Sequence, residues 1–257
     1  MDLGLNGKKA LVTGGSRGIG RCIARALAAE GCDIGICARG SEGLEGARKE
    51  IEAAGVGAYV AQADITRPED VLAFVDGAAA ALGGVDILVN NAGGSAGGTL
   101  LEADDEDWYR TFDLNLMHAV RATRAAVPHM RRAGGGAVCT IASISGWKPG
   151  PRTQYGAAKA AEIFLAGGLA WELAPDNIRV NAVAPGSIYF AGGGWERFAG
   201  EEPEEYERFR RREFPAQRLG RPEEVADVVA FVVSERGGWV NGAMVPVDGG
   251  QGRPSAF

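Results

Sequence analysis

The sequence predicts an α/β fold with a doubly wound, parallel, seven-stranded sheet and helices on both faces. Short apolar runs alternate with longer segments of helical periodicity almost to the end of the chain. Some runs, such as Ile87-Leu88-Val89, are apolar at every position, which is typical of strands covered on both faces. A glycine-rich turn, Thr13–Gly20, lies between the first run and the first helical segment, where such folds bind phosphate groups.

The seven expected strands are short and bounded by glycine or polar residues. In chain order they are Lys9–Thr13, Asp33–Ala38, Ala58–Ala63, Ile87–Asn90, Ala137–Ile141, Arg179–Ala184 and Met244–Val247. Because parallel neighbours need right-handed crossovers, the segments between the strands should be helices that cover the sheet.

The six expected helices are Gly18–Glu30, Ser41–Ala54, Pro68–Leu82, Asp104–Ala133, Tyr155–Leu173 and Pro222–Val233. Before the third helix, Thr66-Arg67-Pro68-Glu69 has the signature of a capping box. The fourth helix begins with Asp104-Asp105-Glu106-Asp107, and acids are favourable at the electropositive N-terminus of a helix.

No repeat, linker or composition break divides the chain, so residues 1–257 are expected to form one domain. Residues 187–221, called the lid segment below, contain no expected strand. After the glycines 192–194, acids crowd residues 201–207 and arginines crowd 208–212, an order that suits a solvated helix. Because this segment follows the sixth strand, it is a candidate lid over a site at the strand ends.

Composition excludes several classes of function. The formal net charge is -6, which does not favour nucleic-acid binding. No run of 18 uncharged apolar residues is present, so no membrane span is expected. Residues 1–9 lack the apolar core of a signal peptide, and a cytoplasmic location is therefore expected.

The cysteines and histidines do not form a recognisable ligand pattern. His118 and His129 share one helical segment without a clustered ligand set, so no metal site is expected. No two cysteines form a C-x-x-C pair, and we interpret them as reduced residues, two of them in strands. The four are Cys22, Cys32, Cys37 and Cys139.

The glycines of Thr13–Gly20 have the spacing G-x-x-x-G-x-G. Gly14 permits a tight strand-to-helix turn and Gly18 lets the backbone approach a pyrophosphate. Gly20 lets the helix pack closely on the sheet. The absence of a Gly-Lys-Ser/Thr sequence argues against a nucleoside-triphosphate loop, so a dinucleotide is the expected ligand.

The end of the second strand indicates which dinucleotide fits. An acid there would bind the ribose 2′-hydroxyl of NAD, but the sequence has Arg39, which suits a 2′-phosphate. Arg17 supplies a second positive charge in the loop. The alternative is that both arginines are surface charges. NADP(H) is therefore expected, and NAD(H) is not excluded.

A possible proton donor and its electrostatic partner lie one helical turn apart. Tyr155 and Lys159 share one helix face, and a nearby cation stabilises a phenolate. Ser143, at the end of the fifth strand, is placed to donate a hydrogen bond to a substrate oxygen. The alternatives are a chance surface pair, a serine that only caps the turn, and Ser145 in place of Ser143.

Taken together, these motifs resemble the short-chain dehydrogenase/reductase family in both order and spacing. The resemblance extends almost to the end of the chain, as far as Gly250. The residues that carry it are Thr13–Gly20, Asn90-Asn91-Ala92-Gly93, Asn115, Ser143, Tyr155, Lys159, Pro185-Gly186, Trp239-Val240-Asn241-Gly242 and Val247-Asp248-Gly249-Gly250. The resemblance implies a Rossmann sheet and hydride transfer between a nicotinamide cofactor and a carbonyl or alcohol carbon.

The resemblance also implies catalytic roles. Tyr155 is the general acid in reduction and the base in oxidation. Lys159 stabilises its phenolate and holds the nicotinamide ribose, Ser143 orients the substrate oxygen, and Asn115 keeps a water in the proton relay behind Lys159. The implied cofactor-binding residues are Gly14, Ser16, Arg17, Gly18, Ile19, Gly20, Arg39, Asp64, Ile65, Asn91, Ala92, Gly93, Tyr155, Lys159, Pro185, Gly186 and Ile188.

The substrate is less well specified. The chain is similar to 3-oxoacyl-carrier-protein reductases, but Asp176 stands where that group has a basic residue for carrier docking. An acid there should repel an acidic carrier, although Arg131 and Arg132 leave a docking patch possible. A small free ketone or alcohol is therefore expected. The candidate substrate contacts, Ser145, Trp147, Tyr189 and Trp195, would with Phe190 and Phe198 line an aromatic pocket, unless these aromatics are simply the core of the lid.

Four alternatives stay open: a carrier-protein reductase, an NAD-dependent alcohol dehydrogenase, a cofactor-binding sensor without turnover, and an isomerase or epimerase. The four-residue catalytic set argues against a sensor, and the short chain leaves no room for a sugar-binding domain. The resemblance further implies a homotetramer in which the fourth and fifth helices pair between subunits.

Overall fold

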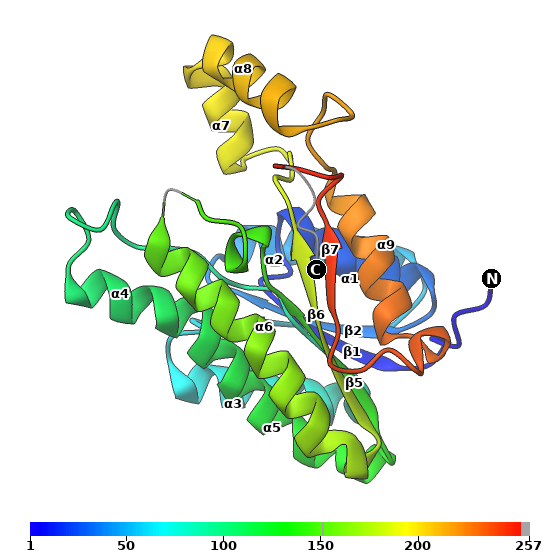
Figure 1. The fold of residues 1–257 in the computed structure, drawn as a ribbon. Helices are drawn as coiled ribbons and strands as arrows, with labels where there is room; N and C mark the ends of the chain where they lie inside the picture. The colour runs from blue at the N-terminus through cyan, green and yellow to red at the C-terminus, as the bar shows by residue number, and fades with distance from the viewer. Residues whose placement is uncertain (151, 253–257) are drawn as a thin grey trace.

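The computed structural model describes residues 1–150 and 152–252. Seven parallel strands form one sheet in the order β3-β2-β1-β4-β5-β6-β7, which confirms the predicted fold class (Figure 1). The strands are β1 Lys9–Thr13, β2 Asp33–Ala38, β3 Ala58–Gln62, β4 Ile87–Asn90, β5 Gly136–Ile141, β6 Ile178–Pro185 and β7 Met244–Val247.

Helices fill the connections between the strands. The α-helices are α1 Gly18–Ala29, α2 Ser41–Ala53, α3 Pro68–Leu82, α4 Asp105–Phe112, α5 His118–Ala133, α6 Thr153–Leu173, α7 Gly194–Glu201, α8 Pro203–Glu213 and α9 Pro222–Val233. Short turns of other helix types are η1 Asp113–Met117, η2 Ile144–Gly146, η3 Ala174–Asp176 and η4 Glu235–Gly237.

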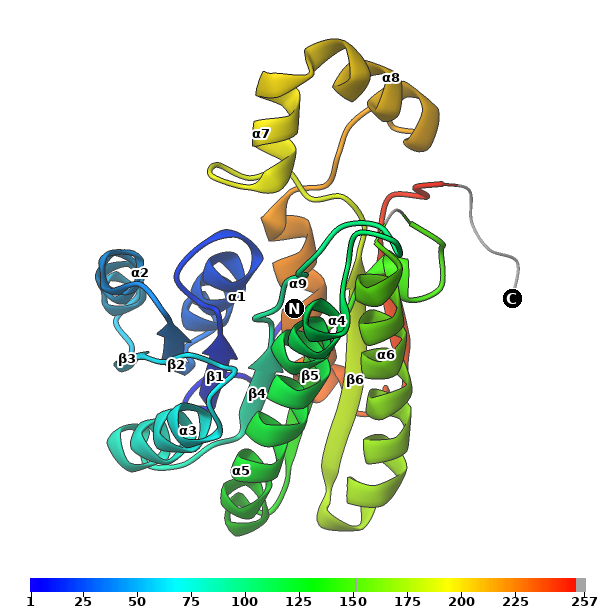
Figure 2. The ribbon, with the colours of Figure 1, turned by 90° about the vertical axis from the view of Figure 1, so that its left-hand side faces the viewer.

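Each face of the sheet has its own hydrophobic core. Helices α1, α2 and α9 pack on one face, and α3, α5 and α6 pack on the other (Figure 2). Strand β1 serves both cores, because Val12 faces the first and Leu11 the second. This double cover explains why the strand sequences are apolar at nearly every position.

The strand order reverses at β1, which has β2 on one side and β4 on the other. The connections after these two strands therefore leave in opposite directions and open a crevice at their carboxyl ends, where doubly wound folds bind ligands. The glycine-rich turn after β1 and the Asn91 segment after β4 meet at this crevice.

The predicted fourth helix is not one regular α-helix. It consists of α4, a π-helical turn η1 and α5, with Asn115 in the π turn. The Asn115 amide donates to the Thr111 carbonyl at 2.6 Å, in competition with the normal backbone pattern. The expectation at its start is confirmed, because the Asp104 carboxylate accepts from the backbone N–H of Asp107 at 2.9 Å.

The predicted capping box before α3 is wrong. Arg67, not Thr66, is the N-cap residue, and its side chain makes no capping bond. The Thr66 hydroxyl donates to Asp64 Oδ1 at 2.8 Å, and Glu69 pairs with Arg67. The nearby carboxylate of Asp64 captures the hydroxyl that the box would have required.

The lid segment forms α7 and α8, which lie beyond the carboxyl ends of the strands (Figures 1 and 2). Helix α8 has Glu204 and Glu205 in its first turn and Arg210–Arg212 in its last, in the order expected for a solvated helix. A bridge between Ile188 and Gly220 joins the two ends of the segment.

Other features of the described residues bear on function classes. Across residues 1–150 and 152–252, no helix is long and apolar enough to cross a membrane. The same residues contain no cluster of three or more metal-ligating side chains. All four cysteines are free thiols; burial raises the pKa of Cys37 and Cys139 to about 12, so both are neutral core residues.

Candidate active site

A cradle of glycines joins β1 to α1 at the crevice. Gly14 and Gly18 adopt φ values of +70° and +55°, which other residues rarely adopt. The backbone N–H of Gly14 donates to the Cys37 carbonyl of β2 at 2.8 Å, which ties the loop to the sheet. The N-terminus of α1 therefore opens into the crevice, and its unpaired N–H groups suit a phosphate.

The glycines also leave space that a side chain would fill. A Cβ on Gly18 would come within 2.8 Å of the Phe190 ring. A Cβ on Gly20 would lie 2.3 Å from Asn91 Nδ2 and 2.4 Å from the Gly14 carbonyl. Gly20 therefore packs closely against Gly14 of its own loop and against Asn91, the residue after β4. It does not pack against the middle of the sheet.

We expect Gly20→Ala to destabilise the fold by about 1–3 kcal/mol, because an added methyl group would overpack the loop. Dinucleotide binding should also weaken, because the added methyl group would displace the glycine-rich turn at Gly14. The change in melting temperature and in NADPH affinity measures both effects. Gly55→Ala is unsuitable as a control because of its φ of +82°, whereas Gly167→Ala adds a methyl group where no atom lies within 4 Å. A Gly20 variant as stable as the Gly167 variant would contradict this account.

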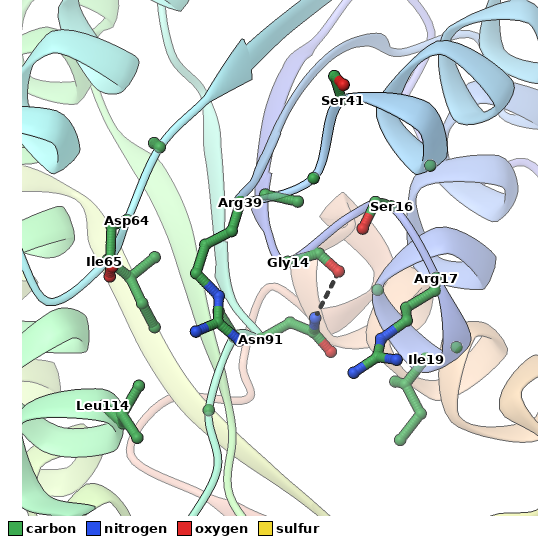
Figure 3. Close-up of a pocket in the computed structure, with 18 of the residues that line it drawn as sticks. Gly14, Ser16, Arg17, Ile19, Arg39, Ser41, Asp64, Ile65, Asn91 and Leu114 are labelled. Carbon is green, nitrogen blue, oxygen red and sulfur yellow. Dashed lines mark hydrogen bonds between the residues drawn. The ribbon is translucent and has the colours of Figure 1, made fainter. Parts of the chain in front are cut away.

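A cavity of about 780 Å³ occupies the crevice (Figure 3). Twelve of the predicted cofactor residues line it: Gly14, Ser16, Arg17, Gly18, Ile19, Gly20, Arg39, Asp64, Ile65, Asn91, Ala92 and Gly93. Ser41, Leu114 and Phe190 also line the cavity, and none of them was predicted to do so as a cofactor residue. The position of Ser41 at the start of α2, two residues after Arg39, was a usable signal.

Two guanidinium groups face into this cavity. Arg17 and Arg39 enter it from different sides (Figure 3). Neither forms an ion pair with any residue that the structure describes, so both charges remain available for an anion. Asp64 lies near Arg39; hydrogen bonds from the Thr66 backbone and hydroxyl, with help from Arg39, hold the pKa of its carboxyl below the usual value.

A second cavity of about 310 Å³ continues the first. The two share Ile19, Asn91, Gly93 and Phe190, so they form one channel along the carboxyl edge of the sheet. The predicted residues that line the second cavity are Ser143, Tyr155, Lys159, Pro185, Gly186, Ile188 and Trp195. The structure therefore brings the predicted catalytic hydroxyls and the lysine together at one end of the channel.

Ser143, Tyr155 and Lys159 have defined partners. Lys159 Nζ lies 5.6 Å from the centre of the Tyr155 ring and donates to the Ile141 carbonyl at 2.9 Å. Ser143 Oγ accepts from the backbone N–H of Ser145 at 3.1 Å. This serine does cap its turn, but the cap uses only an oxygen lone pair and leaves the hydroxyl hydrogen for another acceptor.

Asn115 lies behind the cavity rather than in its wall. Its amide donates to the carbonyls of Gly94 and Thr111, each at 2.6 Å. A Cβ on Gly93 would lie 2.6 Å from Asn115 Oδ1 and 3.4 Å from Lys159 Nζ. Asn115 therefore fixes the Gly93-Gly94 loop close to the lysine.

Thr13 and His118 support the same loop, a role that no sequence motif predicted. The Thr13 hydroxyl oxygen accepts from the backbone N–H groups of Asn91 and Ala92, at 3.0 and 3.1 Å. It lies 2.9 Å from His118 Nε2. Burial lowers the pKa of His118 to about 3, so the ring is neutral and its Nε2 accepts a hydrogen bond from the threonine hydroxyl.

Of the four predicted substrate contacts, only Trp195 lines the channel. Ser145, Trp147 and Tyr189 are not among the described residues of its wall. Trp147 packs instead against the core on the α6 side of the sheet. Tyr189 is 38% exposed.

The lid aromatics form a small core between α7 and α8. Trp195 stacks on Phe209 with ring centres 4.8 Å apart, and Phe198 packs edge-on against Tyr206 and Phe209. Because α7 and α8 protrude from the sheet, their apolar residues have to pack on one another. The lid-core interpretation therefore describes Phe198, while Trp195 belongs to both the lid core and the channel.

The possible carrier-docking residues are paired with other side chains. Arg131 Nη2 lies 2.7 Å from Asp176 Oδ2, and Arg132 Nη2 lies 2.7 Å from His129 Nδ1. Asp176 thus neutralises the arginine that was expected to attract an acidic partner.

Comparisons with known proteins agree with this geometry. A family model described as short chain dehydrogenase matches residues 8–195. The Bos taurus protein "Dehydrogenase/reductase SDR family member 4" is 35% identical over 248 residues, which cover 96% of this chain and 88% of that protein. A Staphylococcus aureus 3-oxoacyl-[acyl-carrier-protein] reductase is 35% identical over 245 residues, covering 95% and 97% of the two chains.

Two solved structures differ in the cofactor that they contain. The L-sorbose reductase from Gluconobacter frateurii, complexed with NADPH and L-sorbose, is 37% identical with a TM-score of 0.93, covering 99% of this chain and 100% of that one. A 7α-hydroxysteroid dehydrogenase complexed with NADH and 7-oxo glycochenodeoxycholic acid is 32% identical with a TM-score of 0.91, covering 98% and 97%. Similarity of fold alone therefore does not choose between the two cofactors.

Proposed function

The chain belongs to the short-chain dehydrogenase/reductase family of oxidoreductases, and from that premise we propose that it transfers hydride between NADP(H) and a carbonyl or secondary-alcohol carbon of a small molecule. The observation that carries the proposal is the continuous channel, with Arg17 and Arg39 at one end and Ser143, Tyr155 and Lys159 at the other. Its two ends match the two ends of a dinucleotide.

The residues of the channel fit this cofactor. The glycine loop and the N-terminus of α1 would hold the pyrophosphate. Arg39 and Arg17 would pair with the 2′-phosphate, which NAD(H) lacks. Pro185, Gly186 and Ile188 would flank the nicotinamide. When bound, the nicotinamide supplies or accepts the hydride.

The chain's own residues transfer the proton and bind the substrate oxygen. The Ser143 hydroxyl donates a hydrogen bond to that oxygen and orients the carbonyl. In reduction, the Tyr155 hydroxyl gives its proton to the same oxygen; in oxidation, its phenolate takes the proton back. The Lys159 ammonium stabilises the phenolate by its charge, and Asn115 holds the loop beside it.

The substrate is expected to be small and free. Phe190 and Trp195 line the reacting end and favour a bulky or aromatic group near the carbonyl. The ion pair between Asp176 and Arg131 disfavours an acidic carrier protein. Carrier-bound reduction remains the second candidate, supported by the identity to the carrier-protein reductase.

A carbonyl panel with NADPH tests the activity. The panel contains L-sorbose, a 7-oxo bile acid, an aromatic ketone, and a 3-oxoacyl thioester both free and on a carrier protein. Loss of nicotinamide absorbance is expected with at least one free ketone and should be weaker with the carrier thioester. Failure of the protein to bind either NADPH or NADH would overturn the proposal.

The proposal includes a homotetramer in which α6 contributes to an interface. Phe164 and Trp171 on α6 are 83% and 88% exposed, which is unusual for large apolar side chains. We expect Trp171→Asp to reduce the assembly to dimers or monomers, because a charge would be buried at the interface. Sedimentation velocity measures this, with Glu172→Gln as the control. A tetramer that survives Trp171→Asp and Phe164→Asp would exclude this face.

Three further expectations complete the proposal. Residues 1–257 work as one domain, and the lid segment 187–221 closes over the bound substrate through α7 and α8. The cytoplasmic location stays a prediction that cell fractionation would test.

A further inference from the structure

Lys159 has a buried acidic partner that the family motifs do not account for. Glu162 lies one helical turn further along α6, and Lys159 Nζ donates to its Oε2 at 2.9 Å and lies 3.2 Å from its Oε1. Lys159 is 3% exposed and Glu162 is 1% exposed. Lys159 is the only hydrogen-bond partner of this carboxylate among residues 1–150 and 152–252.

The two groups maintain each other's charge in a dry environment. Burial raises the pKa of Glu162, and the nearby Lys159 ammonium opposes that rise. Burial pulls the pKa of Lys159 down, but the charges of Glu162 and Tyr155 outweigh it and leave the pKa raised. Lys159 therefore stays a cation. The electric field that acts on Tyr155 is the sum of the fields of the Lys159 ammonium and the Glu162 carboxylate.

Few other ionisable groups act on this pair within the described parts of the chain. Tyr155 precedes Lys159 on α6, and His118 on α5 faces it as a neutral ring. Arg121, which also acts on His118, is paired with Asp113 at 2.6 Å. The strand beside them contributes the neutral Ile141 carbonyl and Ser143 hydroxyl.

We propose that Glu162 is a positioning residue, which holds Lys159 and limits the positive charge that Lys159 presents to Tyr155. An ammonium group has three N–H donors. The Ile141 carbonyl and Glu162 take two of them, which fixes the nitrogen behind the ring and leaves the third for the cavity. A lysine–carboxylate pair acts on the phenolate as a dipole, which is weaker than a single positive charge.

The consequence is a weaker positive potential at the Tyr155 hydroxyl than a lone lysine would produce. The inference rests on the proposed role of Tyr155 in catalysis, but its test follows the ionisation of Tyr155 without cofactor or substrate.

Glu162→Gln removes the charge and preserves the shape. In protein labelled with ¹³C at the tyrosine Cζ, each of the five tyrosines gives one NMR resonance, and Tyr155→Phe identifies the one from Tyr155. We expect the titration midpoint of Tyr155 to fall by about one pH unit in Glu162→Gln, because one nearby negative charge has been removed.

Two control variants separate charge from structure. Glu162→Asp keeps the charge and should titrate within about a third of that shift from the wild type. Glu172→Gln removes an exposed carboxylate from the same helix and should leave the midpoint unchanged. If Glu162→Gln does not fold, Glu162→Asn removes the same charge with a smaller amide whose oxygen can still accept from Lys159, and the same fall is expected.

A wild-type or higher midpoint in the charge-removing variants would overturn the inference, because it would show that Glu162 does not weaken the field of Lys159 or is needed to keep Lys159 protonated. For a substrate found with the carbonyl panel, the pH profile of alcohol oxidation should move to lower pH in parallel. A shifted NMR midpoint without any turnover would instead contradict the proposed function and leave the electrostatic role of Glu162 intact.

Discussion

Tyr155→Phe is expected to lower kcat about a thousand-fold while NADPH still binds, since general acid catalysis by one positioned side chain is worth about 10²–10⁴-fold. Phenylalanine retains the ring that Lys159 approaches at 5.6 Å but removes the hydroxyl that is proposed to give its proton to the substrate oxygen. Steady-state reduction of the best carbonyl of the panel measures kcat, and fluorescence of the bound nicotinamide measures the dissociation constant.

Tyr109→Phe is the matched control for this experiment. Tyr109 is 70% exposed on α4, so its loss should leave both quantities at wild-type values. A Tyr155→Phe protein that reduces ketones at the wild-type rate would show that another group donates the proton. If neither protein turns over any substrate while both bind NADPH, the sensor hypothesis becomes the better explanation.

Arg39→Asp is expected to weaken NADPH binding about a hundred-fold, because a charge-assisted contact to the 2′-phosphate is replaced by repulsion. Affinity for NADH should stay the same or improve, since an acid at this position can accept from the ribose 2′-hydroxyl. Separate fluorescence titrations with NADPH and NADH measure both constants. The expectation depends on the exposed guanidinium of Arg39 facing the cavity (Figure 3).

Salt dependence and a charge-matched control strengthen this test. The NADPH preference of the wild type should shrink as ionic strength rises, because the arginines remain accessible to solvent. Arg124→Asp makes the same charge change on an exposed residue of α5 outside the channel, and it should keep the preference. Equal loss of NADPH affinity in both variants, or no preference in the wild type, would make Arg17 and Arg39 ordinary surface charges.

Local sequence patterns were sufficient to predict the strands and helices of the fold and the polar residues at the two ends of the channel. Strand composition such as that of Ile87–Asn90 depends on burial on both faces, which a parallel sheet imposes on every covered strand. The glycine spacing from Gly14 to Gly20 reflects steric limits that act over a few residues. Tyr155 and Lys159 come together because positions four apart share a helix face.

Predictions that depended on competing partners were less successful. The capping box failed because Asp64, two residues before Thr66, captured its hydroxyl. The single long helix failed because the amide of Asn115 bonds to the carbonyls of Gly94 and Thr111, and a π turn replaces the regular pattern there. Composition does not indicate which of several nearby acceptors a donor will choose.

The sequence by itself determined the sheet, its crossovers, the glycine-rich turn after β1 and the polar residues at both ends of the channel, because these follow from periodicity and short-range geometry. Only the tertiary structure decided that Trp195 reaches the channel while Trp147, partly buried, packs against the core beside α6. It also decided that Asp176 neutralises Arg131 and that Glu162 holds Lys159. These outcomes depend on how separate elements pack, and burial and pairing are properties of the packed molecule rather than of the residues alone.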